Sequence, residues 1–555
     1  MDNPRVLLAI ALSFIILLMW QSWMDDYGPA PEQQVVEGAA TETTDTTGEQ
    51  IQPAPDDMPT SEVLAQKAVD SLPDTKPSAQ PAGEQIEVLT DTYRAVIDTR
   101  GGTLVELDLL QYPETHDPDS PPFKLLEQGD AQLFIAQSGL RTGKTDAEPN
   151  HHALFTADQT HYRLADGAKV IEVPLHWTDS KGVQVTKTYR FHRSSYLINV
   201  GFEVANKSSS NWSARPYYQL QRTPLQKKSR FLYTYTGGVI YSPEEKYEKI
   251  SFSDMEDENL SRDIKGGWAA MLQHYFLGAI IPDPEATAHY YTRALGNERY
   301  LIGFSDQGLS VAPGEQAVTG IRFFAGPKLQ HMMAEVAPGL ELTVDYGKLT
   351  LLAQPIFWLL EKIHALVGNW GWSIIFLTML IKGMFFKLSE TSYRSMAKMR
   401  NLAPRMKALK ERYGDDKQKL NQAMMEMYKT EKVNPLGGCL PVLVQIPVFI
   451  ALYWVLLESV EMRQAPFMLW LQDLSSADPY FILPLLMGIT MLIQQKLNPA
   501  PMDPIQAKVM MVLPVVFTVF FAFFPSGLVL YWVVNNTLSI AQQYVITKRV
   551  ERGEA

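Results

Sequence analysis

The sequence predicts a polytopic α-helical membrane protein with six transmembrane helices, five of them in one core, together with an antiparallel β-sandwich domain and a helical hairpin. Three observations predict this fold. Apolar runs of membrane-spanning length stand only at the extreme N-terminus and after about residue 351. Between them, an acidic segment alternates short apolar and polar runs. Basic and acidic loops alternate along the C-terminal part. The formal net charge of −12 therefore describes no single part of the chain.

The first apolar run predicts an N-terminal transmembrane anchor at residues 5–24. Arg5 precedes the run, and Asp25 and Asp26 follow it. Because positive flanks stay in the cytoplasm, the N-terminus is expected there. A cleaved signal peptide is the alternative. The uncleaved anchor is favoured, because the apolar stretch is long and no cleavage site of small residues follows Trp20 promptly.

The acidic segment divides into two parts. Residues 25–85 are rich in Pro, Thr, Gln, Glu and Ala, which predicts a disordered linker because such a segment buries too little apolar surface to fold. Residues 86–340 carry alternating runs such as Leu104–Leu109, separated by turn residues, and this is typical of an antiparallel β-sandwich. A sugar-binding groove in this domain remains possible. His151 and His152 stand in a polar stretch and are expected to be solvated.

Reactive motifs are missing from the sequence. The single cysteine, Cys439, excludes an intramolecular disulfide. The chain has no CxxC, HExxH, phosphate-binding loop or glycine-rich nucleotide motif in the context that these motifs need. The histidines of the acidic segment lack the spacing of a metal site. We therefore expect no enzyme activity, no catalytic residue, no metal and no cofactor.

The C-terminal part predicts an interfacial helix and five spans. Polar residues at helical spacing within an apolar stretch predict an amphipathic helix in the membrane interface at residues 351–368. The loop before the third span is rich in Lys and Arg, whereas the next loop has only Arg463 among acidic residues. The positive-inside rule therefore places both termini in the cytoplasm and the acidic domain outside. The predicted segments are spans at 369–388, 438–460, 480–495, 508–525 and 527–547, a basic hairpin at 389–434, an outer loop at 461–479, a cytoplasmic loop at 496–507 and a cytoplasmic tail at 548–555.

The basic segment at 389–434 has two apolar stripes at helical spacing, separated by Gly414-Asp415-Asp416. Two such helices joined by a short turn predict an antiparallel coiled-coil hairpin. It is either a connector that obeys the positive-inside rule or a docking arm for the ribosome, the nascent chain or lipid headgroups. The docking interpretation rests on the basic residues Arg405, Lys407, Lys410, Arg412, Lys417 and Lys419.

Lys382 stands inside the predicted second span, about 18 Å along the helix from Trp370. A charge at that depth costs at least about 2.5 kcal/mol, so it normally faces a hydrated cavity or a partner. The spans offer neutral polar groups but no carboxylate, which fits a hydrated groove and does not fit a proton relay. Snorkelling of Lys382 and hydrogen bonding between helices are the alternatives. The groove candidates are Lys382, Thr378, Gln445 and Asn535.

Several motifs closely resemble the YidC family of bacterial membrane protein insertases. The resemblance covers nearly the whole chain and includes the Thr99-Arg-Gly-Gly start of the outer domain. The motifs are Glu431-Lys-Val-Asn-Pro-Leu-Gly-Gly-Cys-Leu-Pro, Gln445-Ile-Pro-Val-Phe, Arg463-Gln-Ala-Pro-Phe, Asp478-Pro-Tyr-Phe-Ile-Leu-Pro and Phe524-Pro-Ser-Gly-Leu-Val-Leu-Tyr-Trp.

The resemblance implies an insertase and chaperone of the Gram-negative inner membrane with a periplasmic β-supersandwich. It would insert integral membrane proteins alone or with the Sec translocon, through a groove that opens to cytoplasm and lipid but is closed toward the periplasm. The implied partners are nascent membrane proteins, the Sec translocon (SecYEG and SecDF), the ribosome and membrane lipids, with no small-molecule substrate. A client helix would slide along spans two and six.

The family's residues fall on specific positions here. The resemblance implies that Lys382 replaces the family's groove arginine, which keeps the charge but loses the planar fork. Thr378 matches the threonine that contacts substrate. The family's aromatic contact falls at Trp532, beside Tyr531, where a tyrosine has become tryptophan. The rivals are a transporter, which would need inverted repeats or intramembrane carboxylates, and an anchored sugar-active enzyme, which would leave five spans unexplained.

Overall fold

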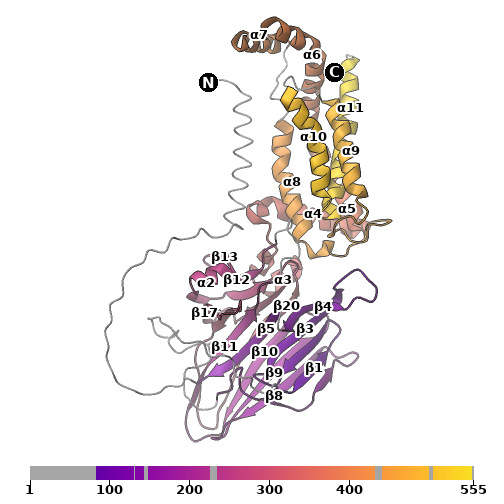
Figure 1. The fold of residues 1–555 in the computed structure, drawn as a ribbon. Coiled ribbons are helices and arrows are strands. Elements are labelled where there is room, and N and C mark those ends of the chain that lie inside the picture. Colours follow the sequence, from indigo (N-terminus) through magenta and orange to yellow (C-terminus); the bar gives the residue numbers. More distant parts are fainter. Residues whose placement is uncertain are drawn as a thin grey trace, which may run out of the picture.

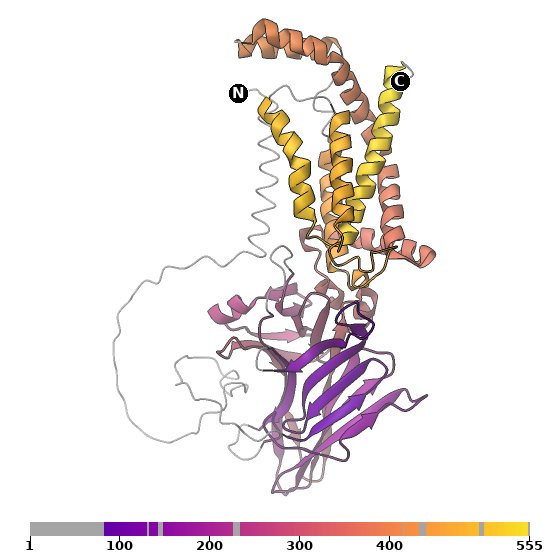
Figure 2. The ribbon, with the colours of Figure 1, turned by 45° about the vertical axis from the view of Figure 1, so that its right-hand side comes forward.

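The computed structural model describes residues 83–129, 132–142, 148–225, 234–414, 416–431, 440–498 and 504–552. The predicted anchor at 5–24, nearly all of the predicted linker and Cys439 lie outside the described residues, as do parts of the loop at 496–507 and of the tail. The described chain forms a β-rich domain followed by a bundle of helices, and the two stand end to end (Figures 1 and 2).

Two large sheets form the β-rich domain, which confirms the predicted sandwich. The first has the order β14-β17-β18-β11-β5-β4-β3-β2-β1-β7, with β19 paired to β11. The second has the order β13-β12-β15-β16-β20-β10-β9-β8-β6. The paired strands run antiparallel except β1 and β7, which are parallel.

The strand bounds are as follows. The first sheet contains β1 (Gln85–Leu89), β2 (Tyr93–Asp98), β3 (Thr103–Pro113), β4 (Pro122–Gln128), β5 (Leu133–Arg141), β7 (His161–Arg163), β11 (Trp212–Arg222), β14 (Ser261–Lys265), β17 (Thr287–Ala294), β18 (Tyr300–Ser305) and β19 (Leu309–Val311). The second contains β6 (Thr156–Ala157), β8 (Val170–Thr178), β9 (Val183–His192), β10 (Leu197–Asn206), β12 (Gly237–Ser242), β13 (Lys246–Ile250), β15 (Trp268–Leu272), β16 (Phe276–Ile281) and β20 (Gln316–Pro327).

Alternation along the strands builds the core between the two sheets. In β9, Val183, Val185, Tyr189 and Phe191 are buried and the even-numbered residues are more exposed, because successive side chains of a strand point to opposite faces. The same alternation turns Lys187 inward. Its Nζ donates to the backbone oxygens of Gly101 and Ser138, and burial lowers its pKa well below the ordinary value.

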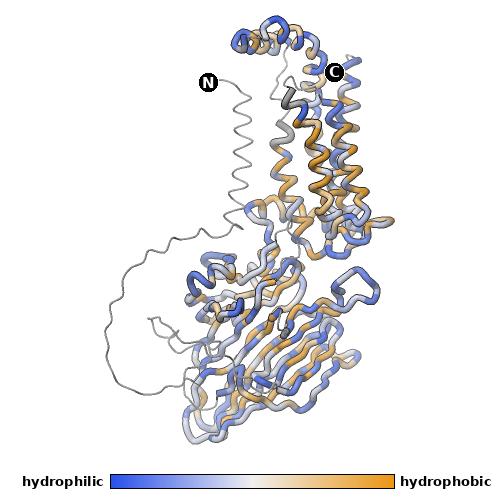
Figure 3. Tube along the Cα trace, in the orientation of Figure 1, coloured by the Kyte–Doolittle hydropathy of each residue, from blue (hydrophilic) through white to orange (hydrophobic). Residues whose placement is uncertain are grey.

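Short helices connect the sandwich to the bundle. They are α3 (Gln330–Val336), η2 (Leu340–Thr343) and η3 (Gly347–Leu349), whereas α2 (Phe252–Asp257) lies within the sandwich, between β13 and β14. The bundle contains α4 (Thr350–Val367), α5 (Trp370–Met384), α8 (Leu440–Glu458), η5 (Val460–Met462), α9 (Ile482–Leu497), α10 (Pro504–Phe521) and α11 (Ser526–Glu551). Apolar residues dominate α8 to α10 and the start of α11, whereas the end of α11 is more polar (Figure 3).

Within the described residues, no single helix combines the length and the apolar composition that a membrane crossing needs. The pair α5 and α6 (Phe386–Tyr413) meets both conditions only when taken together, and its two helices meet at an angle of 68°. Apolar helices too short to meet them are Val444–Glu458, Ile482–Leu497 and Lys508–Phe521.

Two helices extend from the bundle at the end far from the sandwich (Figure 1). They are α6 and α7 (Lys417–Thr430), and they pack against each other through Leu402 and Met406 of the first and Met424 and Tyr428 of the second. Those residues belong to the two stripes read from the sequence.

Candidate functional site

The centre of the bundle is α11, which packs against α5, α6, α8 and α9. Helix α4 covers α5 and α8, and α10 lies against α9. Asn369 caps the start of α5: its side chain accepts the N–H of Trp372 and so satisfies one of the free N–H groups at a helix start. Both α5 and α11 start at the end of the bundle that faces the sandwich (Figure 1).

Lys382 lies between α5 and α11 and is 9% exposed. Its Nζ donates to Ser539 Oγ at 2.6 Å, and that hydroxyl donates to the backbone oxygen of Asn535 at 2.7 Å. Among the residues that the structure describes, no carboxylate lies within ion-pairing distance of this ammonium. A cation held by a neutral hydroxyl inside an apolar bundle keeps hydrogen-bonding capacity for an anion, because an ammonium has three donors.

Two other predicted groove residues, Thr378 and Gln445, differ in the hydrogen bonds that their side chains already make. Thr378 is buried one turn before Lys382, and its hydroxyl donates to the backbone oxygen of Ile374 at 2.6 Å. It therefore presents no free donor in this conformation. Gln445 of α8 is half-buried and makes no side-chain hydrogen bond within the described residues.

Aromatic rings gather where α8, α10 and α11 meet. Trp532 packs edge-on against Phe449 of α8, with ring centroids 4.7 Å apart, and against Phe521 of α10 at 5.7 Å. Tyr531 stacks on the same Phe449 at 5.8 Å. Trp532 Nε1 is buried, and no acceptor among the described residues bonds to it. Sequence reasoning selected Tyr531 and Trp532 but missed Phe449 and Phe521, because every span carries aromatic residues and spacing alone does not say which rings meet.

Other polar groups of α11 serve to join helices. Asn536 Nδ2 donates to Thr490 Oγ1 at 3.4 Å, and Gln543 Nε2 donates to Asn498 Oδ1 at 3.0 Å. Both contacts link α11 to α9 or to its end. The contacts of Asn536 and Gln543 therefore agree with the alternative interpretation, in which polar residues of the spans form hydrogen bonds between helices.

The basic residues of α6 and α7 point away from their shared apolar contact. Arg405, Lys407, Lys410, Arg412 and Lys419 are exposed, and the side chain of Lys417 lies outside the described residues. Two of them are in ion pairs, Arg405 with Glu431 at 2.6 Å and Lys419 with Asp416 at 3.1 Å. Exposed ion pairs of this kind contribute little to stability, so these cations stay accessible to a partner.

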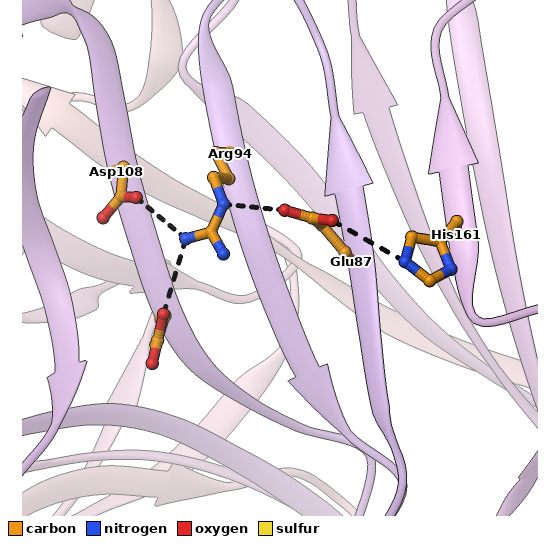
Figure 4. Close-up of polar contacts among 5 residues, drawn as sticks. Glu87, Arg94, Asp108 and His161 are labelled. Carbon is orange, nitrogen blue, oxygen red and sulfur yellow. Dashed lines mark hydrogen bonds and ion pairs between the residues drawn. The ribbon is translucent and has the colours of Figure 1, made fainter.

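The sandwich holds a polar network of its own (Figure 4). Arg94 contacts Glu87 at 2.7 Å, Asp108 at 3.1 Å and Glu106 at 3.6 Å, while His161 lies 3.9 Å from Glu87. Burial raises the pKa of Asp108, although the hydrogen bond from Arg94 opposes that shift. Three carboxylates that share one guanidinium on neighbouring strands form a cross-strand ion-pair network rather than a separated acid and base.

Among the described residues, no three His, Cys, Asp or Glu side chains lie close enough together to bind a metal ion. The described histidines of the sandwich therefore form no metal site. The expectation that His151 is solvated was wrong. His151 is buried, and its Nδ1 lies 2.5 Å from Tyr217 Oη, because the loop after β5 folds it against β11.

Comparison with known proteins gives full-length matches. The family described as YidC periplasmic domain matches residues 85–359, and the family described as 60Kd inner membrane protein matches residues 362–553. A protein named membrane protein insertase YidC from Methylococcus capsulatus is 52% identical over 563 residues and covers 100% of both chains. Its namesake from Thioalkalivibrio sulfidiphilus is 54% identical and covers 100% of this chain and 99% of its own. A crystal structure of an active YidC insertase matches with a TM-score of 0.38 and 18% identity, covering 84% of this chain and 93% of its own.

Proposed function

The chain belongs to the YidC family of membrane protein insertases, and we propose that it inserts and helps to fold integral inner-membrane proteins through a hydrated, positively charged intramembrane groove. The floor of this groove is formed by α5 and α11, and α8 and α10 form its walls. It works alone or with the Sec translocon.

One observation carries the proposal. Lys382 is buried between α5 and α11 with a hydroxyl as its partner, and no described carboxylate neutralises it. A charge in an apolar bundle is costly, so it is retained where it meets water or an opposite charge during function. An acidic residue in the translocated segment of a client supplies that charge.

The driving force comes from the client's apolar helix. As the acidic segment is drawn toward Lys382, the helix moves past the rings of Phe449, Phe521 and Trp532 and out into lipid. Burial of apolar surface is favourable by about 25 cal/mol per Å², so a client helix gains free energy without any covalent step. The resemblance implies a path along spans two and six, which correspond to α5 and α11. The aromatic contacts between α8, α10 and α11 support placing α8 and α10 beside that path as its walls.

The remaining parts of the chain fit this role. We propose that the sandwich is periplasmic and that both termini and the α6–α7 hairpin are cytoplasmic, as the charge distribution predicts. The exposed basic side chains of the hairpin would recruit the ribosome, whose RNA is negative, or lipid headgroups. Nascent membrane proteins are the clients, and SecYEG and SecDF are the translocon partners that the family implies.

Site-specific crosslinking during translation of a small membrane protein tests the proposal. A photo-reactive residue at Trp532 or Asn535 should crosslink to the nascent client. The same group at Leu366, an exposed position of α4 outside the helices of the groove, is the matched control. Crosslinks from the two floor positions should appear early and fade as the client is released. Early crosslinks of equal strength from all three positions would contradict a defined path.

A further inference from the structure

The segment of residues 463–481, which we call the clasp loop, joins η5 to α9 and is held internally by two aspartates. Asp473 accepts hydrogen bonds from the backbone of Gln464 and Ser475 and from the hydroxyls of Ser475 and Ser476, at 2.6–2.9 Å. Asp478 accepts from Trp470 Nε1 and from two backbone N–H groups at the start of α9. Hydrogen bonds within the loop therefore hold it in a defined conformation.

Its backbone is also constrained. Gln464, Leu469 and Phe481 adopt φ values of 55°, 55° and 57°, in the left-handed region that such residues rarely adopt. Conformations of this kind persist only where surrounding contacts enforce them. Buried residues of the loop, Leu471 and Leu474, supply part of that enforcement.

The clasp loop holds the first residues of α5. Asn369 Nδ2 donates to the backbone oxygens of Pro466 and Phe467, both at 3.1 Å. Two residues later, Gly371 lies so close to Phe467 that an added Cβ would stand 2.1 Å from the ring. Asn369 thus uses its oxygen to cap α5 and its nitrogen to fasten the loop.

The same loop holds the first residues of α11. Ser526 Oγ donates to the backbone oxygen of Asp473 at 2.8 Å, and the N–H of Ser526 donates to Ser476 at 2.7 Å. The N–H of Gly527 donates to the backbone oxygen of Leu474 at 2.9 Å. The starts of α5 and α11 are therefore tied together through one loop.

The spacing of these contacts links the clasp to the proposed groove. Lys382 follows Asn369 by thirteen residues, and Ser539 follows Ser526 by thirteen residues. The two helices run in the same direction and are fastened at their starts. They meet again in the hydrogen bond between Lys382 and Ser539, about 20 Å along each helix from its start.

We propose that the clasp loop closes the periplasmic end of the groove, and that Asn369 and Ser526 are the positioning residues that hold α5 and α11 together there. This inference rests on the proposed function, because it assumes the groove. The resemblance already implies a groove that is closed toward the periplasm, and the clasp assigns that closure to named contacts at the starts of α5 and α11.

A separate tie joins the clasp loop to the sandwich and provides a matched control. Arg463 Nη2 donates to the backbone oxygen of Pro113 at 2.5 Å, and its guanidinium lies over the rings of Phe123 and Phe276. This contact leads away from α5 and α11. Gln464 Nε2 also donates to the backbone oxygen of Pro113, at 3.0 Å, so Arg463→Gln weakens the tie without removing it. If the clasp itself is the seal, weakening the tie to the sandwich leaves the groove closed.

Thiol accessibility tests the proposal without depending on insertion activity. In a Cys439→Ser background, Asn535→Cys places one half-buried thiol on the groove floor. A membrane-impermeant maleimide is then added from the periplasmic or the cytoplasmic side of oriented vesicles. The clasp variants are Asn369→Asp, which keeps the cap of α5 but replaces the donating amide, and Ser526→Ala. The control is Arg463→Gln.

We expect the parent and Arg463→Gln to be labelled from the cytoplasmic side only. The two clasp variants should gain periplasmic labelling at a rate about tenfold above the parent, as expected for the loss of one buried hydrogen bond. Parent-level labelling in both clasp variants, or opening by Arg463→Gln alone, would overturn the clasp. If Asn369→Asp fails to accumulate, Ser526→Ala decides the matter. Equal labelling of the parent from both sides would reject the one-sided groove itself, and with it the proposed function.

Discussion

The charge on Lys382 should determine which clients the protein inserts. Replacing Lys382 with Arg keeps the charge and should preserve insertion. Lys382→Ala removes it and should impair clients whose translocated segments are acidic. Lys382→Glu should be worse than Lys382→Ala, because it repels the same carboxylates. Lys387, five residues later, has an almost fully exposed side chain, so Lys387→Ala is the matched control.

The magnitude follows from the surroundings of Lys382. An ammonium and a carboxylate about 4 Å apart attract by about 4 kcal/mol at an effective dielectric constant of about 20. Desolvation of the incoming carboxylate offsets part of this attraction, as does competition with the bond to Ser539. A net preference of about 1–2 kcal/mol corresponds to roughly a tenfold difference in insertion between acidic and neutral versions of one client.

The assay compares one client, carrying an acidic or a neutral tail, in vesicles that contain the parent or a variant. Snorkelling of Lys382 toward the cytoplasm predicts mild effects that ignore client charge. The bond to Ser539 disfavours that alternative, because it holds the ammonium between two helices. Equal insertion of the acidic and neutral tails by Lys382→Ala would refute the electrostatic role and leave Lys382 as an anchor.

Three further predictions follow from other parts of the chain. Burial lowers the pKa of His274 to about 3, while its Nε2 bonds to the backbone oxygen of Leu457. Because the unfolded chain takes up that proton near pH 6.5, stability should fall as the pH drops from 6.5 toward 3, and thermal unfolding of His274→Gln should show a flatter pH dependence than the parent. Gly371→Ala should lower the free energy of unfolding by about 1–3 kcal/mol in denaturant titrations, because its methyl group would overlap Phe467. Deleting residues 403–433 should weaken ribosome binding in a salt-dependent way in a sedimentation assay, and unchanged binding would leave only a connector.

The sandwich and the helical C-terminal region were predictable because their elements have strong local patterns, whereas the number of spans stays a prediction. Alternation marked strands such as β9, and helical stripes marked α6 and α7. The alternating pattern did not predict that Lys187 occupies an inward position, where its ammonium donates to the backbone oxygens of Gly101, in the turn between β2 and β3, and of Ser138 in β5. Nor could it give the order of strands in the sheets. Strands β10 and β20 pair although they lie more than a hundred residues apart, and such pairings depend on the packing of the whole domain.

The candidate site was predictable only where a single residue breaks a local rule. The sequence identifies Lys382 because a charged residue interrupts an otherwise apolar stretch. It does not identify the partner Ser539, since serine is tolerated in spans and lies 157 residues away. Thr378 was selected both as a polar residue one turn before Lys382 and on the resemblance, and the structure shows its hydroxyl bonded to its own helix.

The clasp loop shows why charge patterns can place a segment without explaining it. In the sequence, Asp473 and Asp478 counted as acidic residues of an outer loop and so helped to orient the chain. In the structure both carboxylates are acceptors for the loop's own donors, and the loop they shape fastens α5 to α11. The clasp that we propose thus depends on two aspartates that the sequence pattern marked only as part of an acidic loop, and only the three-dimensional contacts show which donors they accept.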